Sequence, residues 1–209
     1  MFESLSLFKK PKTSRLSGEL SQLSKIYLNP LSSKKIKKAV EFADKAHEGQ
    51  FRKSGEPFLI HPINVGLTLA SLKMDADTII AGLLHDVVED CEISLPTVKK
   101  EFGKNVAALV DGMTKLLKLD DKLKDQSQAE YFQKMALATA SDVRVVIIKL
   151  ADRLHNLKTI EHLPREKQIK KAKETLDLYA PLAHQIGMHK MATDLEDYSF
   201  KTIHPIRHR

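Results

Sequence analysis

Residues 78–90 read Thr-Ile-Ile-Ala-Gly-Leu-Leu-His-Asp-Val-Val-Glu-Asp, an apolar run closed by a group of acidic residues. Read as one continuous helix, the stretch places His85 over Glu89 and Asp86 over Asp90, because residues four apart stack on one face. Carboxylates at the end of a helix repel one another and oppose its dipole, which costs about 0.3–1 kcal/mol each. The pattern therefore fits a bound cation, and it fits a solvated acidic helix end equally well.

Apolar residues recur at helical spacing along most of the chain. Residues 143–150 are rich in β-branched residues and could form a buried strand. The apolar pattern continues to residue 157, which is too long for a typical strand, so we predict a buried helix. The polar residues 119–127 predict a loop. The expected helices run from a cap at Ser32 or Ser33 to Gly49, from His61-Pro62 onward, from a cap at Asp77 to 90, from Ser94 to Gly103, over 106–117, 128–139 and 143–157, from Pro164 to a break at 179–182, and over 190–201.

These helices predict an all-α protein built as a single domain over residues 25–204. Residues 1–24 are mixed polar with little regular period, and we expect a mobile N-terminal extension there. Residues 205–209 are expected to form a short tail.

The charge and composition of the chain indicate which kinds of partner it can bind. The 209 residues include 34 Lys and Arg against 27 acidic residues, a net charge of +7. The basic residues are dispersed and do not alternate with aromatic ones, which favours solvated helix faces over a nucleic-acid-binding surface. A positive field also suits a small polyanionic substrate.

The single cysteine, Cys91, excludes an intramolecular disulfide, and we expect it to be a small packed residue. No apolar run approaches the roughly 20 residues that span a bilayer, and the N-terminus lacks the apolar core of a signal peptide. We therefore expect a cytoplasmic protein without a membrane partner; the sequence leaves its oligomeric state open.

Four side chains are candidate ligands for one metal ion: His61, His85, Asp86 and Asp152. Two imidazoles and two carboxylates without sulfur suit Mn²⁺ or Fe²⁺, and Zn²⁺ is also compatible with them. A single histidine at a helix start, such as His61, is more often a cap or a packed core residue than a ligand. Its role as a ligand requires helices far apart in the sequence to meet.

Three segments carry a resemblance to a known family: Arg-Lys-Ser-Gly-Glu-Pro-Phe-Leu-Ile-His-Pro (52–62), His-Asp-Val-Val-Glu-Asp (85–90) and Lys-Leu-Ala-Asp-Arg-Leu-His-Asn-Leu (149–157). In this order they resemble the hydrolase domain of the RelA/SpoT family, the bifunctional alarmone synthetase/hydrolases. That domain is an HD-type metallohydrolase. The similarity runs from about residue 27 to 204.

The resemblance implies a role for each matching residue. It implies that the four candidate ligands hold Mn²⁺, and that Glu89 and Asp90 are the acidic pair of hydrolysis-competent members. It implies removal of the 3′-pyrophosphate from ppGpp or pppGpp, which yields GDP or GTP. The implied nucleotide-binding residues are Arg52, Lys53 and Ser54 around the guanine base, and Asn156 and Thr159 near the sugar and phosphates.

Two other functions stay open from the sequence. Long family members continue into a synthetase domain that this sequence does not resemble, so we expect no synthesis activity, and the long N-terminal extension favours a truncated long form. Such a fragment could bind guanine nucleotides as a catalytically silent regulatory module. A phosphatase acting on another nucleotide, such as NADPH, is the third reading.

Overall fold

The computed structural model of the chain describes residues 10–122 and 142–205. These residues confirm the all-α class: they contain helices and no named strand, and the only pairing of extended backbone among them is an isolated bridge between Phe51 and Pro57. The chain divides into two compact units, residues 1–114 and 115–209. No helix in the described part of the chain is long and apolar enough to cross a membrane.

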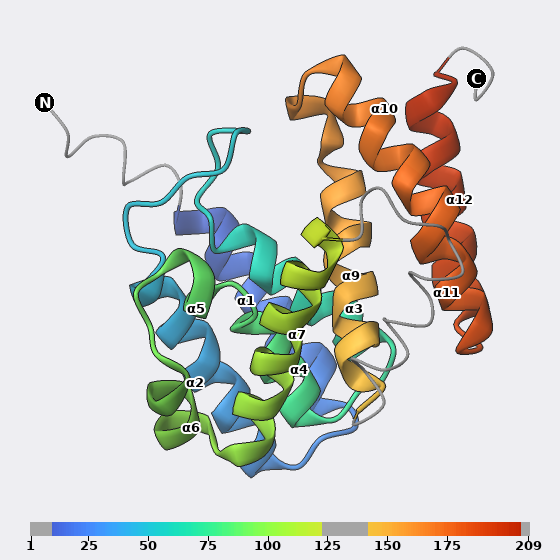
Figure 1. Cartoon of the computed structure of the whole chain (residues 1–209). Helices are drawn as coiled ribbons and strands as arrows, with labels where there is room; N and C mark the ends of the chain where they lie inside the picture. Colours follow the sequence, from blue (N-terminus) through green and yellow to red (C-terminus); the bar gives the residue numbers. More distant parts are fainter. Residues whose placement is uncertain (1–9, 123–141, 206–209) are drawn as a thin grey trace, which may run out of the picture. The chain divides into compact units, whose positions relative to one another are not determined.

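The first unit packs its helices around the segment 60–83 (Figure 1). Helix α1 packs on α3, α2 packs on α4, and α3 packs on α4. Fully buried leucine and isoleucine side chains, among them Leu20, Ile63, Leu69, Ile79 and Leu83, form this core. The helices are α1 (Lys10–Lys25), α2 (Pro30–Ala46), α3 (Ile60–Ser71), α4 (Ala76–Leu83), α5 (Val87–Asp90), α6 (Leu95–Phe102) and the first part of α7 (Lys104–Lys122).

Helix α1 corrects the expectation of an N-terminal extension without regular structure. Leu16, Leu20 and Ser24 are buried and lie four residues apart, so they share one face of the helix. This stripe is short and interrupted by serines and a glycine, which obscures its period in the sequence. The part of the predicted extension before Lys10 lies outside the described residues.

The predicted continuous helix over 78–90 is wrong, because α4 ends at Leu83 and α5 begins at Val87. His85 and Asp86 lie in the turn between them. The Nδ1 of His85 bonds the carbonyl of Gly82 at 2.8 Å. In a continuous helix this carbonyl would accept the N–H of Asp86. A side chain that competes for a helix carbonyl is a known way to end a helix. His85 therefore does not stack over Glu89, and the repulsion expected within one helix does not apply.

Two predicted caps also shift by a few residues. The side chain of Asp75, and not that of Asp77, caps α4 by accepting the N–H of Thr78 at 3.0 Å. Helix α2 is capped by Asn29, three residues before the expected Ser32, because Pro30 occupies the first helical position. The predicted start at Ser94 and stop at Gly103 are confirmed for α6.

The second unit is built on α9 (Arg144–Lys158), which confirms the buried helix predicted over 143–157. Helix α12 packs on α9, on α10 and on α11. The remaining elements are η2 (Ile160–His162), α10 (Arg165–Glu174), the π-helical turn η3 (Thr175–Tyr179), α11 (Ala180–Gln185) and α12 (His189–Ile203).

Two predictions near this unit need correction. The chain does not break at 179–182: a π turn, in which the N–H of Ala180 bonds the carbonyl of Thr175, leads directly into α11. The wider turn comes just before Pro181, whose missing N–H would otherwise break the α-helical ladder. The loop expected from 119 is also wrong as far as Lys122, where α7 ends. The helix predicted over 128–139 lies outside the described residues.

Candidate metal centre

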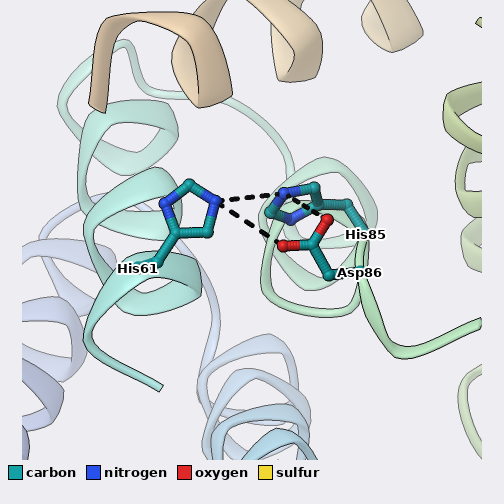
Figure 2. Close-up of side chains that lie close together, drawn as sticks. All are labelled: His61, His85 and Asp86. Carbon is teal, nitrogen blue, oxygen red and sulfur yellow. Dashed lines mark hydrogen bonds and ion pairs between the residues drawn. The ribbon is translucent and has the colours of Figure 1, made fainter. Parts of the chain in front are cut away.

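Three of the predicted ligands meet inside the first unit (Figure 2). The Nε2 atoms of His61 and His85 lie 3.3 Å apart. The carboxylate of Asp86 lies 3.1 Å from the Nε2 of His85 and 3.7 Å from that of His61. His61 is 3% exposed and His85 is 1% exposed, so the imidazoles are withdrawn from solvent. One donor atom from each of the three residues lies within 4.8 Å of the other two.

The local structure aims these donors at one point. His61 stands in the first turn of α3, and His85 stands in the turn that follows α4. If Nδ1 of His85 carries the proton that bonds the Gly82 carbonyl, the lone pair of that ring is on Nε2, the atom that faces His61. This is the usual arrangement of a metal-binding histidine, whose second ring nitrogen is held by a backbone carbonyl or a carboxylate.

The three residues fit a divalent cation. A metal that bonds two imidazole nitrogens at about 2.0–2.1 Å, with an angle near 90–109°, places those nitrogens roughly 2.8–3.4 Å apart. The 3.3 Å between the two Nε2 atoms falls in this range. Asp86 supplies an anionic oxygen on the same side, and hard divalent ions prefer such oxygens.

Glu89 and Asp90 follow the ligands on the short helix α5. Both are exposed to solvent, so a substrate can reach them. Partial desolvation raises the pKa of the Asp90 carboxyl, and the negative charge on Asp86 raises it further, against the opposing effect of nearby imidazoles. A carboxyl group with a raised pKa holds a proton more readily, which suits a general base at moderate pH.

The predicted base-binding residues lie in a tight loop just before α3. The N–H of Arg52 donates to the carbonyl of Glu56 at 2.9 Å, and the N–H of Gly55 donates to the carbonyl of Arg52 at 2.8 Å. Gly55 adopts a φ of 77°, which a glycine allows at low cost. The hydroxyl of Ser54 accepts the N–H of Glu56 at 3.4 Å, so Ser54 braces the turn. Lys53 is exposed at its tip.

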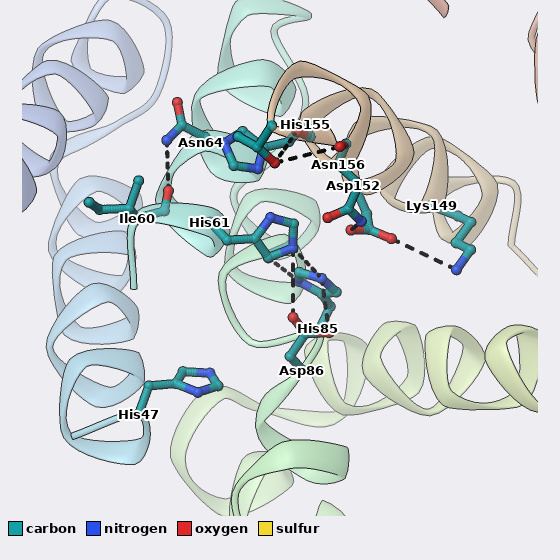
Figure 3. Close-up of polar contacts among 12 residues, drawn as sticks. His47, Ile60, His61, Asn64, His85, Asp86, Lys149, Asp152, His155 and Asn156 are labelled. Atoms are coloured by element: carbon teal, nitrogen blue, oxygen red, sulfur yellow. Dashed lines mark hydrogen bonds and ion pairs between the residues drawn. The ribbon is translucent and has the colours of Figure 1, made fainter. Parts of the chain in front are cut away.

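The other predicted residues lie on α9 of the second unit or directly after it. Figure 3 shows Asp152 and Asn156 on α9, and Thr159 follows the last residue of this helix. Asp152 is buried, and its Oδ1 accepts the side-chain N–H of Asn156 at 2.6 Å. Its Oδ2 lies 3.8 Å from the Nζ of Lys149, a buried lysine to which the sequence analysis gave no role. The hydroxyl of Thr159 donates to the carbonyl of His155 at 3.1 Å. Asp152 is thus held in place within its own unit, and its membership in the same ligand set as His61 stays a prediction.

The comparison with known protein families identifies the family to which this chain belongs. Residues 39–189 match the family model described as the HD domain. The chain belongs to the HD-domain family. This family of metal-dependent hydrolases implies a divalent metal, in agreement with the three donors that the structure brings together.

The sequence of this HD domain is similar to the sequences of RelA/SpoT proteins. This similarity confirms the resemblance found in the segments 52–62, 85–90 and 149–157. The chain is 45% identical over 190 residues to the bifunctional (p)ppGpp synthase/hydrolase SpoT of Escherichia coli K12, covering 91% of the chain and 27% of that protein. It is 48% identical over 176 residues to a guanosine-3′,5′-bis(diphosphate) 3′-pyrophosphohydrolase of Aquifex aeolicus, covering 84% of the chain and 25% of that protein. The chain thus spans about a quarter of the length of these relatives.

One solved structure is similar to this chain over nearly the whole length of the solved chain. It is described as a metazoan ortholog of SpoT that hydrolyzes ppGpp. The two chains are 27% identical, with a TM-score of 0.58, over 88% of this chain and 99% of the other.

Proposed function

We propose that this HD domain removes the 3′-pyrophosphate from ppGpp or pppGpp in a Mn²⁺-dependent reaction. The observation that carries the proposal is the cluster of His61, His85 and Asp86, followed at once by the exposed pair Glu89 and Asp90. Relatives named for this hydrolysis share 43–48% of the matched residues.

His61, His85 and Asp86, together with Asp152, would hold the ion. A bound divalent metal lowers the pKa of water and neutralises charge that builds up on phosphate oxygens. An imidazole that binds a metal is a neutral donor, so the two carboxylates would balance the charge of the ion. Asn156 would act through Asp152, because it donates to the carboxylate that is proposed as the fourth ligand.

Glu89 and Asp90 would handle the proton of the attacking water. Water adds to the phosphorus next to the 3′ oxygen, and the bond from that phosphorus to the 3′ oxygen breaks, which releases pyrophosphate. The 3′ oxygen takes up a proton from solvent, and the nucleotide leaves with a free 3′ hydroxyl. A carboxylate oxygen of Asp90 would accept the proton that the water loses, while Glu89 orients the water. Because its pKa is raised, the carboxylate of Asp90 binds a proton more tightly than an ordinary aspartate does, and a general base for this step requires that.

The loop 52–54 would bind the guanine base. The planar guanidinium of Arg52 can stack on an aromatic base, and the exposed Lys53 can reach an oxygen of the nucleotide. Ser54 would keep the turn closed, as its contact with Glu56 suggests. Thr159 would contribute near the phosphates after its bond to the α9 carbonyl rearranges.

Incubation of the purified protein with ppGpp and Mn²⁺, followed by measurement of pyrophosphate, tests the proposal. We expect turnover by the wild type, a loss of about 10²–10⁴-fold in kcat for Asp90→Ala and for Glu89→Ala, and normal turnover for Glu92→Ala, which removes an exposed carboxylate two residues beyond Asp90. Turnover that survives both substitutions would contradict the proposed roles.

The alternatives appear as distinct outcomes of the same experiment. Calorimetric binding of ppGpp with no pyrophosphate released over hours would replace the hydrolase with a nucleotide-binding module. Faster turnover of NADPH than of ppGpp in a substrate panel would contradict the assignment of the loop 52–54 to a guanine base.

A further inference from the structure

A contact group that is buried at His47 and Cys91 and open to solvent at Asp90 lies beside the proposed site and outside the set of metal ligands. It joins three segments of the first unit: His47 at the end of α2, Gln50 at the start of the base loop, and Asp90 and Cys91 at the end of α5. His47 is 4% exposed, so solvent does not compete for its contacts.

Gln50 is the centre of this group. Its Nε2 donates to the backbone carbonyl of Asp90 at 3.1 Å, and its Oε1 accepts a bond from Nδ1 of His47 at 2.9 Å. His47 Nδ1 also lies 3.1 Å from the sulfur of Cys91. The bond from His47 fixes the side-chain amide, because it holds the oxygen toward the imidazole and so turns the amide nitrogen toward Asp90.

The backbone of Gln50 ties the same residue to the base loop. Its carbonyl accepts the N–H of Phe58 at 3.0 Å, which closes the loop before α3 begins. The ring of Phe58 stacks on His47 with centroids 4.4 Å apart, and it forms an edge-to-face pair with the ring of His61 with centroids 6.2 Å apart. Gln50 therefore contacts the proposed base loop through its main chain and the acidic pair through its side chain.

Helix α5 needs such support. It has four residues, too few for stability of its own, and the carbonyl of Asp90 is among the last ones, which have no partner within the helix. The amide of Gln50 supplies a donor for that carbonyl. Without it, the end of α5 would be held less firmly, and with it the carboxylate of Asp90.

We infer that Gln50 is a positioning residue that couples the base loop to the Glu89–Asp90 pair, with His47 orienting its amide. The inference rests on the proposed function, because it concerns the geometry of the group that handles the proton. Gln50 would act through Asp90, and it is not among the proposed metal ligands or nucleotide-binding residues. It should affect the chemical step and leave the binding of the ion unchanged.

The substitution Gln50→Met tests this, since it keeps the length of the side chain and removes both polar atoms. With ppGpp and Mn²⁺ we expect kcat to fall about tenfold or more, as small displacements of a reacting group do. The Kd for Mn²⁺, measured by calorimetry, should stay within about twofold of the wild type. Gln22→Met is the matched control, because Gln22 is exposed on α1, and it should leave both values unchanged.

Variants of His47 separate orientation from packing. In His47→Asn the amide nitrogen takes the place of Nδ1 and keeps a donor for Gln50, so kcat should stay within about threefold of the wild type. In His47→Leu the donor is lost, and kcat should fall as far as in Gln50→Met. The double variant Gln50→Met/His47→Leu should lose little more than either single variant, because the two residues act as one unit.

The results distinguish a failure of the inference about Gln50 from a failure of the proposed function. No turnover by the wild type would remove the proposed function. A wild type that turns over while folded Gln50→Met keeps its kcat, or loses Mn²⁺ affinity together with kcat, would overturn the inference alone. If Gln50→Met does not fold, Gln50→Glu is judged by the same criteria, because it keeps the acceptor for His47 and replaces the donor to Asp90 with a carboxylate oxygen.

Discussion

His85 shows how one side chain sets both the local backbone and the proposed chemistry. Its Nδ1 bonds the carbonyl of Gly82, which ends α4, and its Nε2 faces His61 and Asp86. The bond that breaks the helix is therefore the bond that orients the proposed ligand. A substitution of His85 would therefore remove both the bond that ends α4 and one of the proposed ligands.

Removal of this proposed ligand should weaken metal binding strongly. For His85→Ala we expect the affinity for Mn²⁺ to fall by more than the roughly 10–100-fold that follows loss of a residue supporting a ligand, with loss of ppGpp turnover. Titration with Mn²⁺ followed by calorimetry measures the affinity. His162→Ala, at an exposed histidine of the second unit, is the control and should bind Mn²⁺ normally. Unchanged affinity in His85→Ala would exclude this cluster as the metal site.

The raised pKa of Asp90 predicts a pH-dependent effect on stability in the metal-free protein. The pKa is higher in the folded than in the unfolded state, so the ionised carboxylate disfavours folding at neutral pH. Asp90→Asn should therefore raise Tm at pH 7, by less than the roughly 2–4 °C that 1 kcal/mol gives in a chain of this size, since the side chain is exposed.

The difference should begin to shrink as the pH falls through the raised pKa of Asp90 in the folded protein. It should disappear below the ordinary pKa of 3.8, where this carboxyl is protonated in the unfolded chain as well. Thermal unfolding in chelator from pH 7 down to about pH 3.5 measures it. Glu48→Gln removes an exposed carboxylate just after α2 and controls for the change in net charge. A stabilisation by Asp90→Asn that persists at the acid end would contradict this origin of the effect.

At the scale of elements, the site depends on the close packing of α3 and α4. Gly82 lies where a Cβ atom would clash with Cδ1 of Leu69 and would lie 3.3 Å from Cγ1 of Val65. Leu69 and Val65 are fully buried in α3, the helix that also carries His61. The absence of a side chain at Gly82 thus allows the approach of the two helices that carry or precede the two imidazoles.

We expect Gly82→Ala to destabilise the protein by about 1–3 kcal/mol, the usual effect of overpacking a core. Gly18→Ala is the matched control, because its Cβ meets nothing within 4 Å and alanine favours a helix by up to about 1 kcal/mol. Denaturant unfolding of both variants gives the comparison. A Gly82→Ala variant as stable as Gly18→Ala would show that the helices need no such approach.

The caps of α4 give a second test at this scale. Asp75→Ala should cost about 0.5–2 kcal/mol, because it removes the acceptor for the N–H of Thr78. Asp77→Ala should cost less, since Asp77 only bonds the exposed side chain of Asn105 at 3.1 Å. The free energies of unfolding from urea titrations rank the two variants. The reverse ranking would support the cap expected from the sequence.

Helices α4 and α9 also show what a sequence can predict. The apolar period of 143–157 is strong enough to identify α9 in spite of its β-branched residues. The break after Leu83 has no such signal, because it depends on the bond of a histidine ring to a carbonyl three residues before it. Residue types identified His61 and His85 as candidate ligands, whereas the role of Gln50 depends on its contact with a carbonyl 40 residues away.

At the scale of the whole molecule, the proposed ligand set draws on both compact units. The HD-domain match runs across residues 39–189 and so includes residues of each unit. His61, His85 and Asp86 belong to the first, and Asp152 is held by Asn156 in the second. The sequence alone cannot establish that residues so far apart meet, and the family resemblance supplies that expectation.

Metal binding should therefore stabilise the whole chain through Asp152. At one hundred times its Kd, Mn²⁺ should stabilise the wild type by about 2.7 kcal/mol. At the same concentration Asp152→Asn should gain less, because it binds the ion more weakly, and Glu166→Gln, an exposed carboxylate of α10, should gain as much as the wild type. Thermal unfolding with and without Mn²⁺ measures these gains. An equal gain in Asp152→Asn would confine the metal to the first unit.

The most direct test is the anomalous scattering of crystals grown with Mn²⁺. We predict one manganese peak, bonded by the Nε2 atoms of His61 and His85 and by carboxylate oxygens of Asp86 and Asp152, at distances of about 2.0–2.3 Å. A peak elsewhere, or one bonded by the first three residues with Asp152 turned away, would contradict a metal centre built from both units.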